Sequence, residues 1–319
     1  MTINSSATIR IAQFAAHAQL ADLPDSVVVA ARDLVGVCVA SGIRSASTPE
    51  ASALHEILVQ LDTATELPST GGAVFGTHGR LSRSAAVTFN GACIARVPPR
   101  LLDSSLGLAP GPAVVSSVIA AAELGGGTGH MLLESVVVGT ETGLRLARAV
   151  AKQRPSSGWS MQGVTGRVAA AVAVVKVLGG GVDEFRQAIG LGATQAAGLE
   201  RSAPSAAAAL LTGKVAADGF EAGLLSLTNW KGPEQPLEGG RGFFRLITGL
   251  TDASEVVAGL GDDWLLPKLA LDSCATEQIR RLLDGETPTT ADSLVQYLHA
   301  IESTDTQELV RLMRAEVPA

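Results

Sequence analysis

Apolar residues recur at helical spacing along most of the chain. In the first segment Ile9, Ala12, Phe14 and Ala15 give one buried face, and hardly any stretch alternates as a half-buried strand does. Residues 71–77 are the exception and are expected to be a short extended piece. The pattern predicts helices over residues 6–18, 26–40, 49–61, 82–94, 113–124, 131–152, 164–178, 183–198, 205–227, 273–283 and 291–313.

Helix after helix with almost no strand signal predicts an all-α fold. The long helix 131–152 carries Glu134, Glu141, Arg145 and Arg148 on its polar positions. Two triple glycines, at 125–127 and 179–181, are similar in composition to phosphate-binding loops. However, neither follows a strand or ends in Lys-Ser/Thr, so we expect both to stop helices.

Composition excludes several classes of function. Hydrophobic residues make up 46% of the 319 residues and aromatic ones only 3%, so the core must be built from small side chains that let helices approach closely. The net charge is -7 and the basic residues are scattered, which argues against nucleic-acid binding. Residues 1–11 lack the features of a secretory signal, and the apolar runs are too short to span a membrane. We therefore expect a cytoplasmic protein.

Cysteine and histidine offer no recognisable chemistry. Three widely separated cysteines give neither a disulfide framework nor a zinc signature. The five histidines include no pair with metal-ligand spacing, so structural or solvent-exposed roles are favoured. The sequence predicts no metal and no cofactor.

The loop within residues 90–114 is the first candidate site. It is rich in Pro and Gly and carries Arg100, Asp103, Ser104 and Ser105 between two apolar helices. Loops of this composition, placed by a helical scaffold, often bind ligands, although an ordinary surface connection has the same composition.

The order of several motifs resembles the MmgE/PrpD family, whose members include 2-methylcitrate dehydratase, cis-aconitate decarboxylase and iminodisuccinate epimerase. The resemblance runs from Ile9 to Phe244 and is fainter at residues 260–264. The motifs that carry it are DLPDSV (22–27) with ARDLVG (31–36), the approach from Arg80 to Gly91, VVGTE (137–141) with RLA (145–147), GLGATQAAGL (190–199), GKVAADG (213–219), and WKGP (230–233) with LEGGRGFF (237–244).

This resemblance implies a large helical domain, usually dimeric, with a pocket closed by a smaller α+β lid. The whole of residues 1–319 is then expected to be one helical domain, with a family-like body over 1–250. Residues 251–319 are expected to be a truncated remnant ending in a helix that packs back on the body, so the lid is missing or reduced.

The residues that the family uses on polycarboxylates have been replaced. The first loop histidine falls near Ala95, the His-Pro-Gly element has become Ala109-Pro110-Gly111, and a later histidine falls at Ser160. The aspartate positions fall among residues 98–101, and the lysine position within 205–210 holds no lysine. Proton abstraction beside a carboxylate needs a positioned base and a clamp for the acid groups. Both sets are gone.

The polar groups that remain near the expected pocket are the candidate site. Helix capping by Asp103 and Ser104, and a solvated first-turn role for Lys214, are the alternatives to chemistry. The candidates are Asp103 and Lys214 as catalytic residues, and Arg100, Ser104, Ser105, Trp159, Ser160, Gln162 and Arg201 as substrate-binding residues, with Glu200 beside them.

Three functions stay open at this point. A pocket that has lost histidines and acids prefers a more apolar guest, so the first is cyclisation, cycloaddition or isomerisation of a bulky, polyketide-like substrate in specialised metabolism such as antibiotic biosynthesis. The second is an inactive family member that serves as a binding or scaffold protein. The third and weakest is a dehydratase or decarboxylase of a small polycarboxylate. Under the first of these hypotheses the protein is a homodimer that binds a small-molecule substrate, and neither a nucleic acid nor a membrane is a partner.

Overall fold

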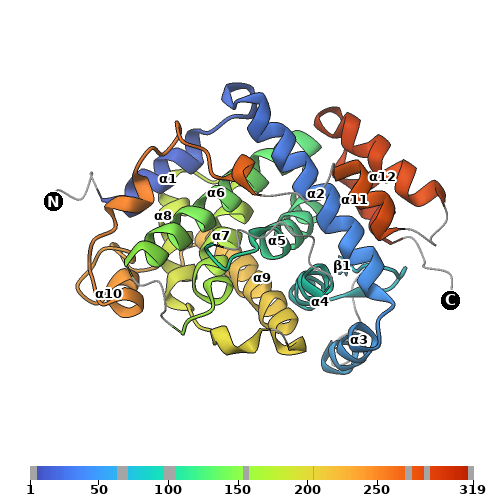
Figure 1. The fold of residues 1–319 in the computed structure, drawn as a ribbon, viewed down its shortest axis with the longest axis horizontal. Coiled ribbons are helices and arrows are strands. Elements are labelled where there is room, and N and C mark those ends of the chain that lie inside the picture. The colour runs from blue at the N-terminus through green and yellow to red at the C-terminus, as the bar shows by residue number, and fades with distance from the viewer. Residues whose placement is uncertain are drawn as a thin grey trace.

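Two helices that are apolar on nearly all sides lie inside the fold. α5 (Pro110–Gly125) and α7 (Met161–Val177) consist mainly of Ala, Val, Gly and small hydroxyl residues, and nearly all of their residues are buried. A helix without a polar face is stable in water when other helices surround it. α7 packs against α5, α6 (Gly129–Gln153), α8 (Val182–Thr194) and α9 (Ala206–Ser226), and Figure 1 shows it among these helices.

The computed structural model describes residues 6–62, 71–96, 105–153, 158–203, 205–269, 275–283 and 288–314. Within these ranges the all-α class is confirmed. The single sheet there is a hairpin of β1 (Gly72–Ala73) and β2 (Arg80–Leu81), with Gly72 opposite Leu81. The other helices are α1 (Ala7–His17), α2 (Asp25–Ala46), α3 (Pro49–Asp62), α4 (Arg83–Arg96), α10 (Phe243–Thr248), α11 (Ala275–Leu282), α12 (Pro288–Ala300) and α13 (Thr306–Met313).

Glycines on α6 and α9 let both helices approach α7 closely. A Cβ added at Gly139 of α6 would lie 2.7 Å from the carbonyl oxygen of Ala169, and one at Gly219 of α9 would lie 2.8 Å from that of Arg167. Any side chain at these positions would force the helices apart. The small residues of the core therefore serve close helix packing, as the composition predicts.

The C-cap role expected for the triple glycines is confirmed. Gly126 follows α5 in the left-handed conformation, with φ of 71°, and its N–H donates to the carbonyl of Ala122. Gly179 follows α7 with φ of 76°, and Gly181 is the N-cap of α8. The glycines of both triplets therefore end a helix, the second triplet also begins the next one, and neither forms a phosphate-binding loop.

Several predicted helix boundaries are wrong, and α5 begins at Pro110, three residues before its predicted start. α2 continues through Ser41 and Gly42 to Ala46, and Gly42 lies inside it where the ring of Phe75 leaves no space for a side chain. α8 ends at Thr194 instead of residue 198. α7 begins at Met161, three residues before the predicted start, since Ser160 caps it.

The predicted helix 291–313 is in fact two helices. α12 ends at Ala300, and Asp305 caps α13 by accepting from the N–H of Gln307. The turn between them is held by contact with the end of α5, since the hydroxyl of Thr306 donates to the carbonyl of Gly127 at 2.6 Å. α12 and α13 pack on α2, and α13 also packs on α5.

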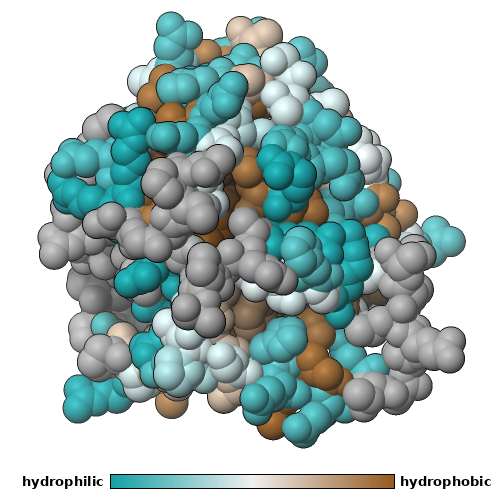
Figure 2. Space-filling model, turned by 90° about the vertical axis from the view of Figure 1, so that its right-hand side faces the viewer, coloured by the Kyte–Doolittle hydropathy of each residue, from teal (hydrophilic) through white to brown (hydrophobic). Residues whose placement is uncertain are grey.

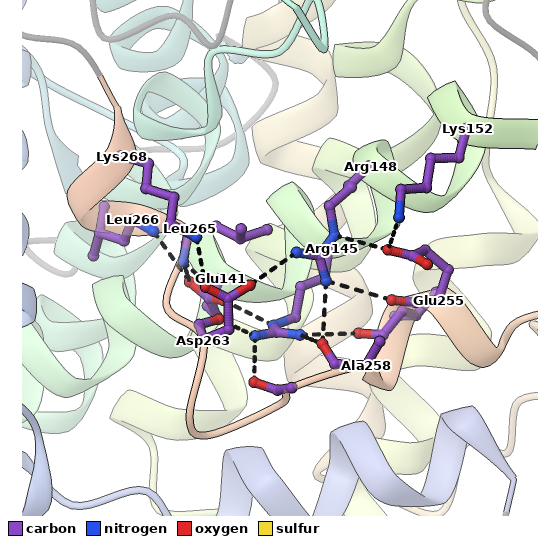
Figure 3. A network of polar contacts seen from close by, with 12 residues as sticks. Glu141, Arg145, Arg148, Lys152, Glu255, Ala258, Asp263, Leu265, Leu266 and Lys268 are labelled. Carbon is purple, nitrogen blue, oxygen red and sulfur yellow. Dashed lines mark hydrogen bonds and ion pairs between the residues drawn. The ribbon is translucent and has the colours of Figure 1, made fainter.

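Two of the four charged residues at the polar positions of α6 are buried. Glu141 is 0% exposed and Arg145 is 1% exposed, and they form an ion pair. Arg145 also donates to the carbonyls of Ala258 and Gly259, while Glu141 accepts from the N–H of Leu265. Figure 3 shows this network, which attaches residues 255–268 to α6.

One helix passes a length and composition test for spanning a membrane. Among the described residues this helix is α2, and 67% of its most apolar 18-residue stretch is buried in the fold. Figure 1 shows α2 running alongside α11 and α12, and both helices pack against it. α2 is thus placed as a core helix. Figure 2 shows the face on this side of the molecule, which is largely hydrophilic with apolar residues in and around a hollow.

Candidate active site

A cavity of about 560 Å³ lies where five segments from distant parts of the sequence meet. They are the end of α4, the segment after residue 104 with the start of α5, the end of α6, the start of α7 and the turn that leads into α9. The described residues that line it are Ala95, Ser105, Leu106, Gly107, Ala109, Pro112, Ala151, Trp159, Ser160, Met161, Gln162, Glu200, Ser202, Ala203, Ala208, Leu211 and Thr212.

Two loops are fastened together at this cavity by backbone hydrogen bonds. The N–H of Ser160 donates to the carbonyl of Gly198 at 3.1 Å, and the N–H of Glu200 donates to that of Gly158 at 3.0 Å. Between them Trp159 and Leu199 form an isolated antiparallel bridge. The residues predicted from the second loop therefore have a fixed backbone.

The start of α7 is fixed by its cap and by a buried arginine. Ser160 Oγ accepts from the N–H of Gly163 at 3.2 Å, which satisfies one free donor of the first turn. Arg167 Nη1 donates to the carbonyls of Gly163 at 2.6 Å and Ala197 at 3.1 Å, and its Nε donates to Asp218 at 2.8 Å. Arg167 is thus a structural clamp between the two loops and α9.

Gln162 is the most unusual polar group in the cavity wall. Its side chain is 9% exposed, and neither Nε2 nor Oε1 has a hydrogen-bond partner among the described residues. Leaving a buried amide unpaired costs on the order of 1–3 kcal/mol. Such a group in a cavity wall marks a place where a ligand can supply the missing partners.

The described part of the cavity wall carries little charge. Among the described lining residues Glu200 is the single ionisable group, and none is basic. The polar groups are otherwise hydroxyls and the amide of Gln162. This wall suits neutral ligands better than polyanions, because a buried carboxylate needs charged or multiple N–H partners.

The structure brings together four of the predicted residues. Ser105, Trp159, Ser160 and Gln162 all line the cavity, although two separate stretches of sequence supply them. Their roles in binding stay predictions. Arg100, Asp103 and Ser104 lie outside the described residues, so their positions are not given.

Lys214 and Arg201 are not brought into the cavity. α9 presents Ala208, Leu211 and Thr212 to it, and Lys214 lies two residues beyond Thr212, about 200° around the helix. Both Lys214 and Arg201 are exposed. For Lys214 the reason is helical periodicity, because the cavity-facing side of α9 carries small and apolar residues and Lys214 lies on another side. Arg201 lies before α9, in the turn Glu200–Ser202.

Sequence reasoning missed the contribution of α9 to the wall. Ala208, Leu211 and Thr212 follow the i, i+3, i+4 spacing of one helix face, which is a usable signal. The spacing does not say whether that face meets a packed core or a cavity. Only the position of α9 against α4 and α7 decides this.

Two other cavities adjoin this one. One of about 620 Å³ shares Trp159 with it and is lined by residues from 193–196 and 233–247, including Arg241. The other, of about 380 Å³, lies between α3, α4 and α9 and is lined mainly by Ala and Leu with Cys93. Burial raises the pKa of the Cys93 thiol, so it stays protonated and is a poor nucleophile. The 560 Å³ cavity is the candidate site because several loops and an unpaired amide converge on it.

The fold and cavity define the class: an α-helical domain whose interhelical loops enclose a ligand-sized cavity. The model of the MmgE/PrpD N-terminal domain matches residues 9–255, and this chain belongs to the MmgE/PrpD family. The resemblance inferred from the motifs is thereby confirmed.

Curated relatives agree with this assignment. A cis-aconitate decarboxylase of Aspergillus terreus is 28% identical over 274 residues, covering 82% of this chain and 55% of that protein. The cis-aconitate decarboxylase-like protein oryM of Aspergillus oryzae is 28% identical over 207 residues, covering 62% of this chain and 42% of that protein. The chain spans about half the length of the curated relatives it matches.

Proposed function

We propose that this protein is an enzyme that folds a bulky, largely apolar substrate into one reactive conformation for cyclisation, cycloaddition or isomerisation. The observation that carries the proposal is the cavity wall. Its described residues include no cation, and Glu200 is their single carboxylate. A citrate-like acid would lose its water shell there without gaining charged partners, whereas an apolar skeleton would not.

The size and shape of the cavity support the same conclusion. Its volume of about 560 Å³ falls in the range of pockets for drug-sized molecules. Alanines form much of the wall and leave room for a ring system. Holding reacting groups in position supplies roughly 7–11 kcal/mol in favourable cases, and reactions within one molecule gain most from it.

Mass conservation gives a sharp test of this proposal. Isomerisation, cyclisation and intramolecular cycloaddition all leave the molecular mass unchanged. We would incubate the purified protein with a metabolite extract of the organism that encodes it and follow the compounds by liquid chromatography and mass spectrometry. The expected result is one compound consumed and one of equal mass formed, and loss of that conversion in Trp159→Ala.

Two results would contradict the proposal. Release of carbon dioxide or water from cis-aconitate or 2-methylcitrate would favour the chemistry named for the relatives. Absence of any conversion in the extract would favour the binding or scaffold function. A homodimer, a cytoplasmic location and a reaction without cofactor belong to the same proposal and stay predictions.

A further inference from the structure

We infer that the cavity recognises its substrate through a neutral edge in which a carbonyl oxygen stands beside an N–H or O–H donor, and that the amide of Gln162 binds this edge. The inference rests on the proposed function, because it names the polar group carried by the otherwise apolar substrate. It starts from the unpaired side chain of Gln162.

In the protein without a ligand, the unpaired amide of Gln162 destabilises the fold, and no contact among the described residues offsets this loss. Its two polar atoms are shielded from water and lack partners among the described residues. A methionine or leucine would fill the same volume without that cost. Apart from Glu200, the described wall is apolar or hydroxylic, and none of its groups is a hydrogen-bond partner of the amide.

The amide of Gln162 lies one turn further along α7, beside Gly166. An added Cβ at Gly166 would be 3.1 Å from Nε2 and 2.7 Å from Cγ1 of Val215, so the absence of a side chain at Gly166 accommodates the amide in this rotamer. Gln162 also lines the cavity, and rotation about its three side-chain bonds would turn the amide toward it. A ligand that supplies both hydrogen bonds stabilises that rotamer.

A second set of donors lies at the N-terminus of the same helix, next to the cavity wall. The N–H groups of Met161 and Gln162 are in the first turn of α7, which has 17 residues, and neither has an acceptor among the described residues. Ser160 Oγ already accepts from the N–H of Gly163, which leaves its hydroxyl hydrogen free to donate. These donors and the positive end of the helix dipole favour a ligand oxygen at this position.

The combination defines the ligand group. Nε2 and the first-turn N–H groups call for a carbonyl oxygen, while Oε1 of Gln162 calls for a donor next to it. A carboxylate has no such donor, and Glu200 in the same wall would repel it. A lactam, an imide or a neutral hydroxy-enone presents the complementary edge, and each is a natural part of a folded polycarbonyl skeleton.

Ring compounds of similar size separate the contributions of the two hydrogen bonds. δ-Valerolactam has both groups, δ-valerolactone lacks the donor, and N-methyl-2-piperidone has the donor blocked. Maltol tests the O–H form of the edge. We would titrate each into the full chain and follow the side-chain NH₂ signal of Gln162 by nitrogen-15 NMR, assigning it by its loss in Gln162→Met.

We expect δ-valerolactam to bind roughly fivefold to tenfold more tightly than the lactone, as one additional hydrogen bond implies. Gln162→Met should remove this preference. Gln195→Met is the matched control, because Gln195 is exposed and outside the cavity wall. Tighter binding of maltol than of δ-valerolactam would assign the donor to an O–H group.

The remaining outcomes overturn the inference in distinguishable ways. Equal binding of all four rings, unchanged in Gln162→Met, would remove the role of Gln162 and leave the proposed function intact. Failure of every neutral ring to bind, with cis-aconitate shifting the Gln162 signal instead, would overturn both.

Discussion

Glu141 and Arg145 form a buried ion pair one turn apart on α6, with Arg145 Nε donating to Oε1 of Glu141 at 2.7 Å (Figure 3). Burial raises the pKa of the Glu141 carboxyl, and the charge of Arg145 and two backbone N–H groups act in the opposite direction. The remaining donors of Arg145 bind backbone carbonyls of residues 256–263. The pair therefore holds this segment against the helix.

Breaking this pair should strongly destabilise the protein. Arg145→Met leaves a buried carboxylate without its cation, and we expect the free energy of unfolding to fall by about 3–5 kcal/mol. Urea denaturation measures the change. Arg311→Met is the control, because its partner Glu308 lies at the surface and such pairs contribute less than about 1 kcal/mol. A similarly small loss for Arg145→Met would show that the network does not stabilise the fold.

Gln162→Leu should make the empty protein more stable. The substitution removes an unpaired buried amide and keeps the volume, so we expect a gain of about 1–2 kcal/mol in the same denaturation experiment. Gln195→Leu, at an exposed position, should change little. A loss of stability in Gln162→Leu would mean that ordered water already satisfies the amide.

Filling the cavity should abolish binding without unfolding the protein. Ala208→Phe places a ring in the 560 Å³ cavity, whereas Ala207→Phe, the matched control, points to the smaller cavity beside α3. The fluorescence of the neutral dye Nile red should increase when it binds the wild type or Ala207→Phe. We expect Ala208→Phe to bind the dye at least tenfold less tightly. Equal binding by both variants would place the dye elsewhere.

The contact between α4 and α9 should not tolerate a side chain at Gly213. A Cβ there would lie 2.2 Å from the carbonyl oxygen of Thr88. We expect Gly213→Ala to lower the free energy of unfolding by roughly 1–3 kcal/mol. Gly240→Ala is the control, since no heavy atom lies within 4 Å of its added Cβ. An unchanged midpoint for Gly213→Ala would contradict the close approach of the two helices.

Lys176 should make stability depend on alkaline pH. Its Nζ donates to the carbonyl of Ala18 at 2.6 Å, and burial lowers the pKa of its ammonium below the ordinary 10.5, although Glu134 acts in the opposite direction. Between the two pKa values the unfolded chain binds more protons, so stability rises with pH across that window.

We therefore expect wild type to gain stability relative to Lys176→Met as the pH is raised from neutral toward 10.5. Urea unfolding of both proteins across this range measures the difference. A constant difference would show that the pKa of Lys176 is the same in the folded and unfolded states.

The helical pattern was readable from the sequence because each long helix has its own periodicity and end signals. α9 is predicted within one residue at each end, and both triple glycines stop helices as expected. Errors fall where another segment overrides a local signal. The sequence pattern predicts that the helix ends at residue 40, just before Ser41 and Gly42. In the structure Gly42 lies inside the helix, and the ring of Phe75 packs where a side chain would be.

The candidate site was readable only in part. The motif order identified the two loops that supply Ser105, Trp159, Ser160 and Gln162. Sequence reasoning assigned Lys214 to the same site and overlooked Thr212, because the direction in which a helical residue points depends on which face of α9 meets α7. Arg100, Asp103 and Ser104 lie outside the described residues and stay predictions.

The sequence by itself determined the all-α class and the family, since these depend on residue identity and spacing. The replacement of the family's histidines and lysine stays a prediction from the resemblance. Tertiary structure alone decided that the two loops share one cavity, that Glu141 and Arg145 are buried, and that the amide of Gln162 is left unpaired. The physical reason is the same in each case. Burial and hydrogen-bond partners depend on segments brought together from distant parts of the chain, and no local pattern encodes them.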